Sequence, residues 1–265
     1  MVNAKLINKW NEWSETWYPI YRTDEVISGI IRNPESAFHP ATYAMLRQAC
    51  PTLEGKRICV PSSGNNHAAF AFHLMGASVT SVDISERQIA NSAAIAAKHG
   101  WDIQFICDNT MTLGEIPSNA YDLVYTSNGV HVWIDDLSAM YRSIHRILTD
   151  GGTYLMLDVH PFNRPFDKGS QTPTIVKSYD ATGPIVIDDI PLYNWRMQDL
   201  MNAMITAGLR LDQIEEMFAE DGSFWIDDSI HDVDSFSAEE LEDLCDWRSN
   251  PMAALPQWLS IKAKK

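Results

Sequence analysis

One acidic residue, Asp83, stands where a carboxylate would bind the sugar of a nucleotide-like cofactor, and a second acid, Asp108, follows the next predicted strand. Asp83 closes the β-rich run 79–82, 19 residues after Gly64, and Asp108 closes the next such run. A carboxylate about 20 residues beyond a glycine turn accepts hydrogen bonds from vicinal ribose hydroxyls. The spacing therefore predicts that Asp83 binds a ribose. The alternative is a turn acid that caps the helix beginning near Ser85.

The turn before these acids reads Ser62-Ser63-Gly64-Asn65-Asn66 and holds a single glycine. A dinucleotide site has several glycines at this place, because they let the backbone approach a pyrophosphate closely. The turn also lacks the Gly-Lys-Ser/Thr sequence of a P-loop. The pattern disfavours nicotinamide and flavin dinucleotides, and it leaves a cofactor with adenine and ribose but no pyrophosphate.

Strand-like and helical segments alternate through the middle of the chain. The predicted strands are 57–61, 79–82, 103–107, 122–126 and 153–159, and the predicted helices are 68–75, 85–99 and 137–148. This alternation predicts right-handed βαβ units and an open parallel sheet with helices on both faces. Ligands of such sheets bind beyond the carboxyl ends of the strands. The first turn, both acids and the segment 127–131 all fall there.

The flanking regions are expected to complete one α/β domain. Residues 1–55 form an N-terminal helical region, in which Trp10, Trp13 and Trp17 share one helical face. Residues 56–160 form the core. Residues 161–265 hold an irregular cap over 163–191, a helix over 195–207, and strands over 209–217 and 258–263.

Several of these motifs occur in a fixed order along the chain. They are R-I-C-V-P-S-S-G-N-N, S-V-D-I-S, F-I-C-D-N, Y-D-L-V-Y-T-S-N-G-V-H and I-L-T-D-G-G-T-Y-L-M-L-D. In this order they resemble the motifs of class I S-adenosylmethionine-dependent methyltransferases. The resemblance implies a Rossmann-like, seven-stranded, mostly parallel sheet with a helical lid. It also implies S-adenosylmethionine as cofactor and S-adenosylhomocysteine as product.

Carried over residue by residue, the resemblance implies a cofactor site. Gly64 and its neighbours would wrap the methionine part, Asp83 would bind the ribose, and Asp108 would accept a hydrogen bond from the adenine amino group. Asn128 would lie near the sulfonium. The full predicted set is Ser62, Ser63, Gly64, Asn66, Asp83, Ile84, Asp108, Asn109 and Asn128.

The first motif departs from the family pattern, acid-x-Gly-x-Gly-x-Gly. Val60 stands in place of the acid, Ser62 in place of the first glycine and Asn66 in place of the third. The central glycine, Gly64, is kept. The departure bears on cofactor affinity more than on fold.

Candidates for catalysis and substrate binding follow from their places in the predicted fold. His131 and His160 fall at strand ends, and either imidazole could act as a general base. The alternative for His160 is a turn residue before Pro161. The lid and substrate candidates are Trp17, Tyr18, Tyr21, Trp195 and Arg196. The alternatives are ordinary core packing for the aromatic residues and a surface position for Arg196.

The charge balance limits the partners. The 265 residues carry 35 acidic and 20 basic side chains, a formal net charge of -15. Nucleic-acid phosphates and anionic membranes are bound through Lys and Arg side chains. The excess of acidic residues therefore argues against nucleic acids and membranes as partners. Thirteen of the acids lie in residues 215–246, which hold no Lys or Arg. This segment indicates a solvated surface or a basic partner.

Other features set the expected compartment and acceptor. The four cysteines form no C-x-x-C pair, and no apolar run suits a signal peptide or a membrane span. We therefore expect a cytoplasmic protein.

The fourth-strand segment lacks the Asn-Pro-Pro-Tyr type of sequence, and this absence favours a small-molecule acceptor. No paired metal-ligand spacing is present. The alternatives are a non-catalytic binding protein with the same fold and, less favoured, a dinucleotide oxidoreductase.

Overall fold

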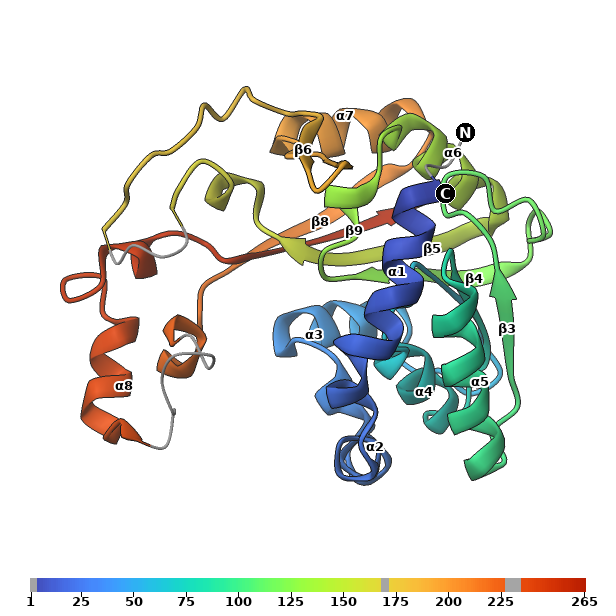
Figure 1. Cartoon of the computed structure of the whole chain (residues 1–265). Coiled ribbons are helices and arrows are strands. Elements are labelled where there is room, and N and C mark those ends of the chain that lie inside the picture. Colours follow the sequence, from blue (N-terminus) through green and yellow to red (C-terminus); the bar gives the residue numbers. More distant parts are fainter. Residues whose placement is uncertain (1–3, 168–171, 227–234) are drawn as a thin grey trace.

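The computed structural model describes residues 4–167, 172–226 and 235–265. Its centre is a seven-stranded sheet in the order β3-β2-β1-β4-β5-β9-β8 (Figure 1). The strands are β1 (Arg57–Pro61), β2 (Ser78–Asp83), β3 (Ile103–Cys107), β4 (Tyr121–Ser127), β5 (Leu148–Val159), β8 (Arg210–Met217) and β9 (Trp258–Lys264). Strands β1 to β5 run parallel, and β9 lies antiparallel between β5 and β8. The predicted Rossmann-like sheet is confirmed.

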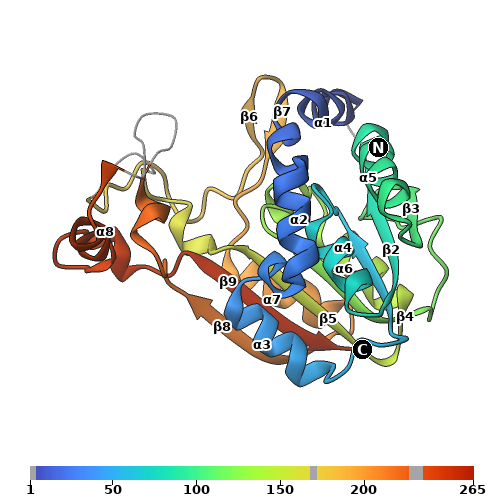
Figure 2. The ribbon, with the colours of Figure 1, turned by 90° about the horizontal axis from the view of Figure 1, so that it is seen from below.

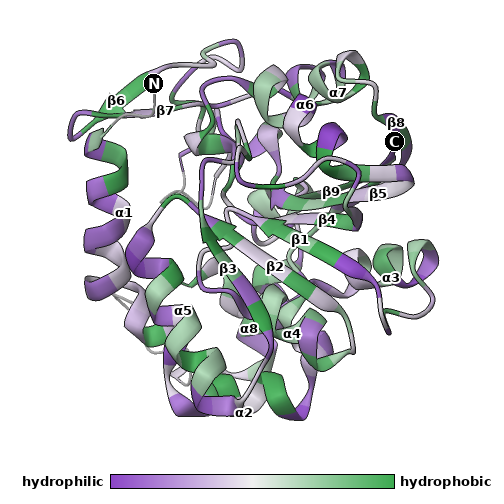
Figure 3. Cartoon of the chain, turned by 90° about the vertical axis from the view of Figure 1, so that its right-hand side faces the viewer, coloured by the Kyte–Doolittle hydropathy of each residue, from purple (hydrophilic) through white to green (hydrophobic). Residues whose placement is uncertain are grey.

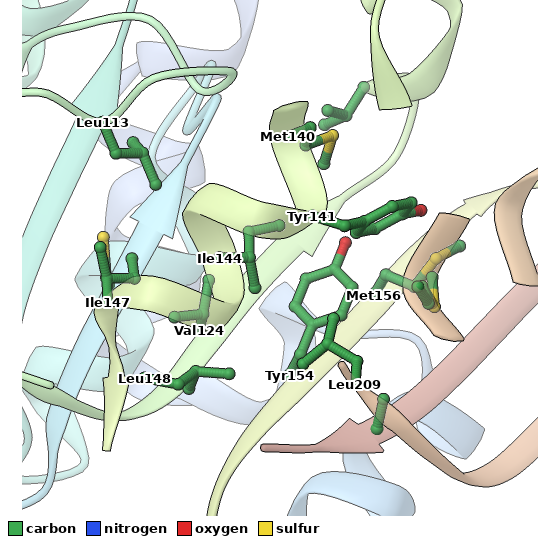
Figure 4. Packing of buried hydrophobic residues seen from close by; sticks show 14 of the residues in the cluster. Leu113, Val124, Met140, Tyr141, Ile144, Ile147, Leu148, Tyr154, Met156 and Leu209 are labelled. Atoms are coloured by element: carbon green, nitrogen blue, oxygen red, sulfur yellow. The ribbon is translucent and has the colours of Figure 1, made fainter. Parts of the chain in front are cut away.

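Alternate residues of the central strands enter two separate hydrophobic cores. Val124 packs in the core under α6 (Leu137–Ile147) and α7 (Met197–Thr206), shown in Figure 4. Its neighbour Leu123 packs in the core on the other face. There the covering helices are α2 (Asp24–Arg32), α3 (Pro40–Ala49) and α4 (His67–Leu74) (Figure 2). Because successive strand residues point to opposite faces, near-continuous apolar strands need helices on both.

The helix after β2 shows how local sequence sets an element's ends. In α5 (Glu86–His99), Ser85 Oγ accepts a hydrogen bond from the Gln88 N–H at 3.1 Å, and this caps the first turn. Gly100 ends the helix in the left-handed conformation, with φ of 69°. Both ends match the predicted helix 85–99.

Three elements were not predicted. They are α2, the hairpin β6 (Ile185–Ile187) and β7 (Ile190–Leu192), and α8 (Ala238–Cys245). Helix α2 lies between Pro19 and Pro34. Thr23 caps it by accepting from the Val26 N–H. It is stabilised by burying Ile27 and Ile30, which is tertiary packing that periodicity over nine residues does not reveal.

The acidic segment 215–246 spans the end of β8, η5 (Gly222–Trp225) and α8. Figure 1 shows α8 beyond the ends of β8 and β9, apart from α1 (Ala4–Thr16). Residues 227–234 of the segment lie outside the described residues. No helix in the described ranges is long and apolar enough to cross a membrane.

The N-terminal region lies against α5 (Figure 3), where α1 forms a largely polar edge of the molecule. Asn11 Oδ1 accepts a hydrogen bond from the Ser85 hydroxyl at 2.7 Å, and the Ser14 hydroxyl donates to Gln88 Oε1 at 3.0 Å. The 3-10 helix η1 (Tyr18–Arg22) follows α1 directly. These contacts place the aromatic face of α1 above the carboxyl ends of the parallel strands.

Candidate functional site

A cavity of about 320 Å³ lies at the carboxyl ends of β1, β2 and β4, under α1 and η1. Its polar half comes from the strand-end turns: Ser62, Ser63, Gly64, Asn65, Asp83, Ile84, Asn109, Thr110, Met111, Ser127, Asn128 and Gly129. Its aromatic half is Leu6, Trp10, Trp17, Tyr18, Tyr21, Val130, Trp133, Ile134, Asp135, Pro191 and Tyr193. The volume is in the range of small-molecule sites, about 300 to 1,000 Å³.

The Asp83 carboxylate holds the first turn against the start of α5. Its Oδ2 accepts a hydrogen bond from the Gly64 N–H at 2.9 Å, and its Oδ1 accepts one from the Ser85 N–H at 2.9 Å. Burial raises the pKa of Asp83 to about 6, although these N–H groups act to lower it. The cap of α5 is Ser85, so Asp83 is not the solvent-facing helix cap of the alternative interpretation; its buried carboxylate joins the two turns and lines the polar half of the cavity.

The first turn adopts left-handed backbone at three residues with only one glycine. The φ angles are 51° at Ser62, 52° at Gly64 and 64° at Asn66. Asparagine tolerates this conformation because its side chain bonds locally, and here Asn66 Nδ2 donates to Gly64 O at 3.1 Å and to Ser92 Oγ at 2.9 Å. The side chain of Asn66 is thus buried behind the turn, outside the cavity lining where it was expected.

The turn after β3 presents Asn109 to the cavity, and Asp108 lies behind it. The Asp108 carboxylate accepts hydrogen bonds from the Asn109 N–H at 2.7 Å and the Glu115 N–H at 2.9 Å, and it is absent from the lining. Ser62 and Thr110 are joined by a hydrogen bond of 2.8 Å between their hydroxyls. The first and third turns are therefore fixed to one another. Of the predicted cofactor residues Asp108 and Asn109, only Asn109 lines the cavity.

The loop after β4 is held in place by a buried carboxylate at the end of β5. Asp158 Oδ1 accepts a hydrogen bond from the Gly129 N–H at 2.9 Å, and Oδ2 accepts one from the His131 N–H at 3.0 Å. Burial acts to raise the pKa of Asp158, but the hydrogen bonds and charge of His131 outweigh it and lower the pKa to about 2. This bracing keeps Asn128, with φ of 27°, in the cavity wall.

The structure places both predicted catalytic histidines away from the cavity. His131 Nδ1 donates to Asp158 Oδ2 at 2.5 Å, and Nε2 bonds the Tyr141 hydroxyl at 2.8 Å. His160 Nδ1 accepts from a backbone N–H, so Nε2 donates to Glu216 Oε1 at 2.8 Å. Both rings are buried with both nitrogens engaged. Neither histidine lines the cavity, which differs from the expectation.

The three predicted lid residues Trp17, Tyr18 and Tyr21 all line the aromatic half. The Trp10 ring lies 5.1 Å from the Trp133 ring at 76°, which joins α1 to the segment after β4. A Cβ placed on Gly64 would lie 3.6 Å from the Tyr18 hydroxyl, so Tyr18 directly covers the first turn. The aromatic residues therefore roof the polar half as well as packing α1.

The two other substrate candidates lie behind the lining. Trp195 donates from Nε1 to Ile134 O at 2.8 Å, and its ring stacks on Tyr193 at 5.6 Å and 7°. Arg196 pairs with Asp199 at 2.9 Å at the start of α7. It is Tyr193, two residues earlier than Trp195, that reaches the cavity.

Several lining residues were missed by the sequence reasoning. Trp133 and Asp135 follow the predicted fourth-strand segment by a few residues, so a wider window after that strand would have included them. Tyr193 and Pro191 carry no such signal, because the β6–β7 hairpin brings them in from the cap. Across the described ranges, no group of three His, Cys, Asp or Glu residues is placed to bind a metal ion.

Residues 61–156 match a protein-family model described as a methyltransferase domain. A search of curated proteins finds no match. The match over residues 61–156 and the sheet order both agree with the resemblance to class I S-adenosylmethionine-dependent methyltransferases.

Solved structures support the fold. One is an S-adenosylmethionine-dependent methyltransferase from Mesorhizobium loti, with a TM-score of 0.63 and 21% identity over 85% of this chain and 98% of that one. A geranyl diphosphate methyltransferase in complex with S-adenosylmethionine has a TM-score of 0.59 and 15% identity, covering 84% of each chain. The cyclase SpnF has a TM-score of 0.57 and 18% identity, covering 85% of this chain and 79% of the other. Since a cyclase shares it, the fold alone does not decide the reaction.

Proposed function

We propose that the protein is an S-adenosylmethionine-dependent methyltransferase that transfers the methyl group in line to a small-molecule acceptor. The observation that carries this proposal is one continuous cavity that joins the polar half to the aromatic half. The polar half suits a nucleoside with an amino-acid chain. The aromatic half suits a second, largely apolar ligand beside it.

The described residues fit this cofactor. Asp83 would accept from the ribose hydroxyls, and the N–H groups and hydroxyls of residues 62–65 would contact the methionine part. Asn109 would lie beside the adenine. The rings of Trp10, Trp17 and Tyr18 favour a cationic sulfonium nearby. When bound, the cofactor supplies an electrophilic methyl group.

The small-molecule assignment rests on how the cavity is closed. Helix α1 and the β6–β7 hairpin approach each other over it, joined at the surface by Lys5 and Asp189 at 2.8 Å. None of its lining residues is Lys, Arg or His, so the cavity offers no cationic side chain to a phosphate backbone. The geranyl diphosphate methyltransferase with this fold is named for a small acceptor, which agrees with the proposal.

We infer that the residues act mainly by positioning. In the transfer, the acceptor atom forms a bond to the methyl carbon while the carbon–sulfur bond breaks and its electron pair stays on sulfur. Alignment of the two reacting atoms supplies much of the rate for such a displacement. Asn128 and Gly129, braced by Asp158, set one wall of this path, and the aromatic roof excludes water.

The four cysteines, Cys50, Cys59, Cys107 and Cys245, are all free. This agrees with a reducing compartment, and we propose that the protein acts in the cytoplasm.

The test is calorimetry with S-adenosylmethionine and S-adenosylhomocysteine, followed by incubation with methyl-labelled cofactor and a metabolite extract. We expect both to bind and the label to appear in a small molecule. The absence of binding by either would overturn the proposal. Binding with no transfer to any fraction would favour a non-catalytic binding protein instead.

A further inference from the structure

Three separate parts of the chain build the far wall of the aromatic half. Trp10 comes from α1, Trp133, Ile134 and Asp135 come from the segment after β4, and Pro191 and Tyr193 come from β7 and the residues after it. Figures 2 and 3 both show the β6–β7 hairpin beside α1. We call these six residues the acceptor wall. None of them belongs to the strand-end turns of the polar half.

The rings of the acceptor wall are held from behind. Tyr193 donates its backbone N–H to Val132 O at 2.9 Å, and its ring is stacked on Trp195. Trp195 is itself tied to Ile134 O. Trp133 lies edge-on to Trp10 at 5.1 Å and to Trp13 at 5.6 Å. The aromatic surface is therefore preformed, and it need not be ordered when a ligand enters.

The charge of the cavity is of one sign. Its acidic residues are Asp83 and Asp135, and no Lys, Arg or His residue lines it. Asp83 is occupied by two backbone N–H groups. Asp135 is exposed, and none of the described residues forms a hydrogen bond or an ion pair with its carboxylate. Asp135 and Tyr193 line the same cavity, and burial together with the charge of Asp135 raises the pKa of Tyr193.

We propose that the acceptor carries a basic amine on an apolar or aromatic body, with its ammonium group held between Asp135 and the rings of the acceptor wall. This rests on the proposed function of the cavity. A carboxylate is the natural partner of an ammonium ion, and aromatic faces add attraction for a cation. An anionic acceptor would meet two carboxylates and no cation, so a carboxylate or phosphate group is selected against.

The experiment compares two isosteric probes, phenylethylamine and phenylpropionate, binding to the protein saturated with S-adenosylhomocysteine. The tryptophans of the cavity report binding through their fluorescence, and calorimetry confirms it. We expect the amine to bind at least about tenfold more tightly than the carboxylate, as an ion pair and a cation–ring contact together allow. Asp135→Asn should remove most of that difference.

Asp102→Asn is the matched control. Asp102 is also exposed and lies before β3, at the opposite end of the strand from the cavity. Its replacement should leave the preference for the amine intact. Equal binding of the two probes, tighter binding of phenylpropionate, no binding of phenylethylamine, or an unchanged preference in Asp135→Asn would each overturn the inference. Failure of S-adenosylhomocysteine itself to bind would instead overturn the proposed function, so the two failures are distinguishable.

Discussion

Nδ1 of His131 lies 2.5 Å from Oδ2 of Asp158, and this buried pair joins the loop after β4 to the end of β5. The same carboxylate accepts the backbone N–H groups of Gly129 and His131. We therefore propose that His131, which its sequence position marks as a possible base, acts as a positioning residue. Its ring fixes the carboxylate, and the carboxylate fixes the cavity wall.

Exchange of His131 for asparagine distinguishes positioning from catalysis. His131→Asn keeps an N–H near the place of Nδ1, so we expect turnover to fall by less than about tenfold, whereas loss of a general base costs about 10² to 10⁴. Asp158→Ala should lower the free energy of unfolding by about 2 kcal/mol, because several buried donors lose their acceptor. Denaturant unfolding and initial rates measure the two effects. A loss above a hundredfold in a stably folded His131→Asn protein would restore a catalytic role.

Removal of the Asp83 side chain should weaken binding of the cofactor. Asp83→Ala loses the acceptor for the ribose and the brace on Gly64, and we expect S-adenosylhomocysteine binding to weaken by about 1 to 3 kcal/mol, the range for hydrogen bonds to a charged group. Calorimetry measures this, with Asp102→Ala as the control for loss of one surface acid. An unchanged dissociation constant would show that the ribose lies elsewhere.

Cofactor affinity should also depend on pH through Asp83. Its pKa in the folded protein is raised to about 6 by burial, so the carboxyl group takes up a proton as the pH falls through that value. Ribose hydroxyls donate to the ionised form, and affinity should therefore fall below pH 6 and level off above pH 7. Asp83→Asn should bind more weakly with a flat profile over this range. The raised pKa also means that ionisation of Asp83 costs stability as the pH rises toward 6.

The aromatic roof gives a prediction about motion. Trp10 contacts the rings of Trp13, Trp133 and Tyr18, and each such pair contributes about 0.5 to 1.5 kcal/mol. Trp10→Ala should loosen α1, which hydrogen exchange of peptides 4–16 will show as faster labelling. Trp247→Ala is the matched control, since Trp247 is 56% exposed and outside the cavity lining. Equal exchange in the two variants would mean that the hydrogen bonds of α1 to α5 suffice to hold it.

Much of the fold could be predicted from the sequence. The parallel strands and the helices between them were found because their apolar runs, caps and stops are local signals, as at Ser85 and Gly100. The short helix α2 and the hairpin β6–β7 were missed, because burial of Ile27, Ile30 and Ile190 by distant segments stabilises them.

The sequence by itself determined which turns form the polar half of the cavity, since residues at the carboxyl ends of parallel strands meet at one edge of the sheet. Only the tertiary structure decided which side chains of those turns face the cavity. Asn66, Asp108 and His131 satisfy buried backbone and side-chain groups, and their neighbours Gly64, Asn109 and Val130 face the opening. Spacing along a chain does not report the direction of a side chain in a loop, because that direction depends on which hydrogen-bond partners other strands supply.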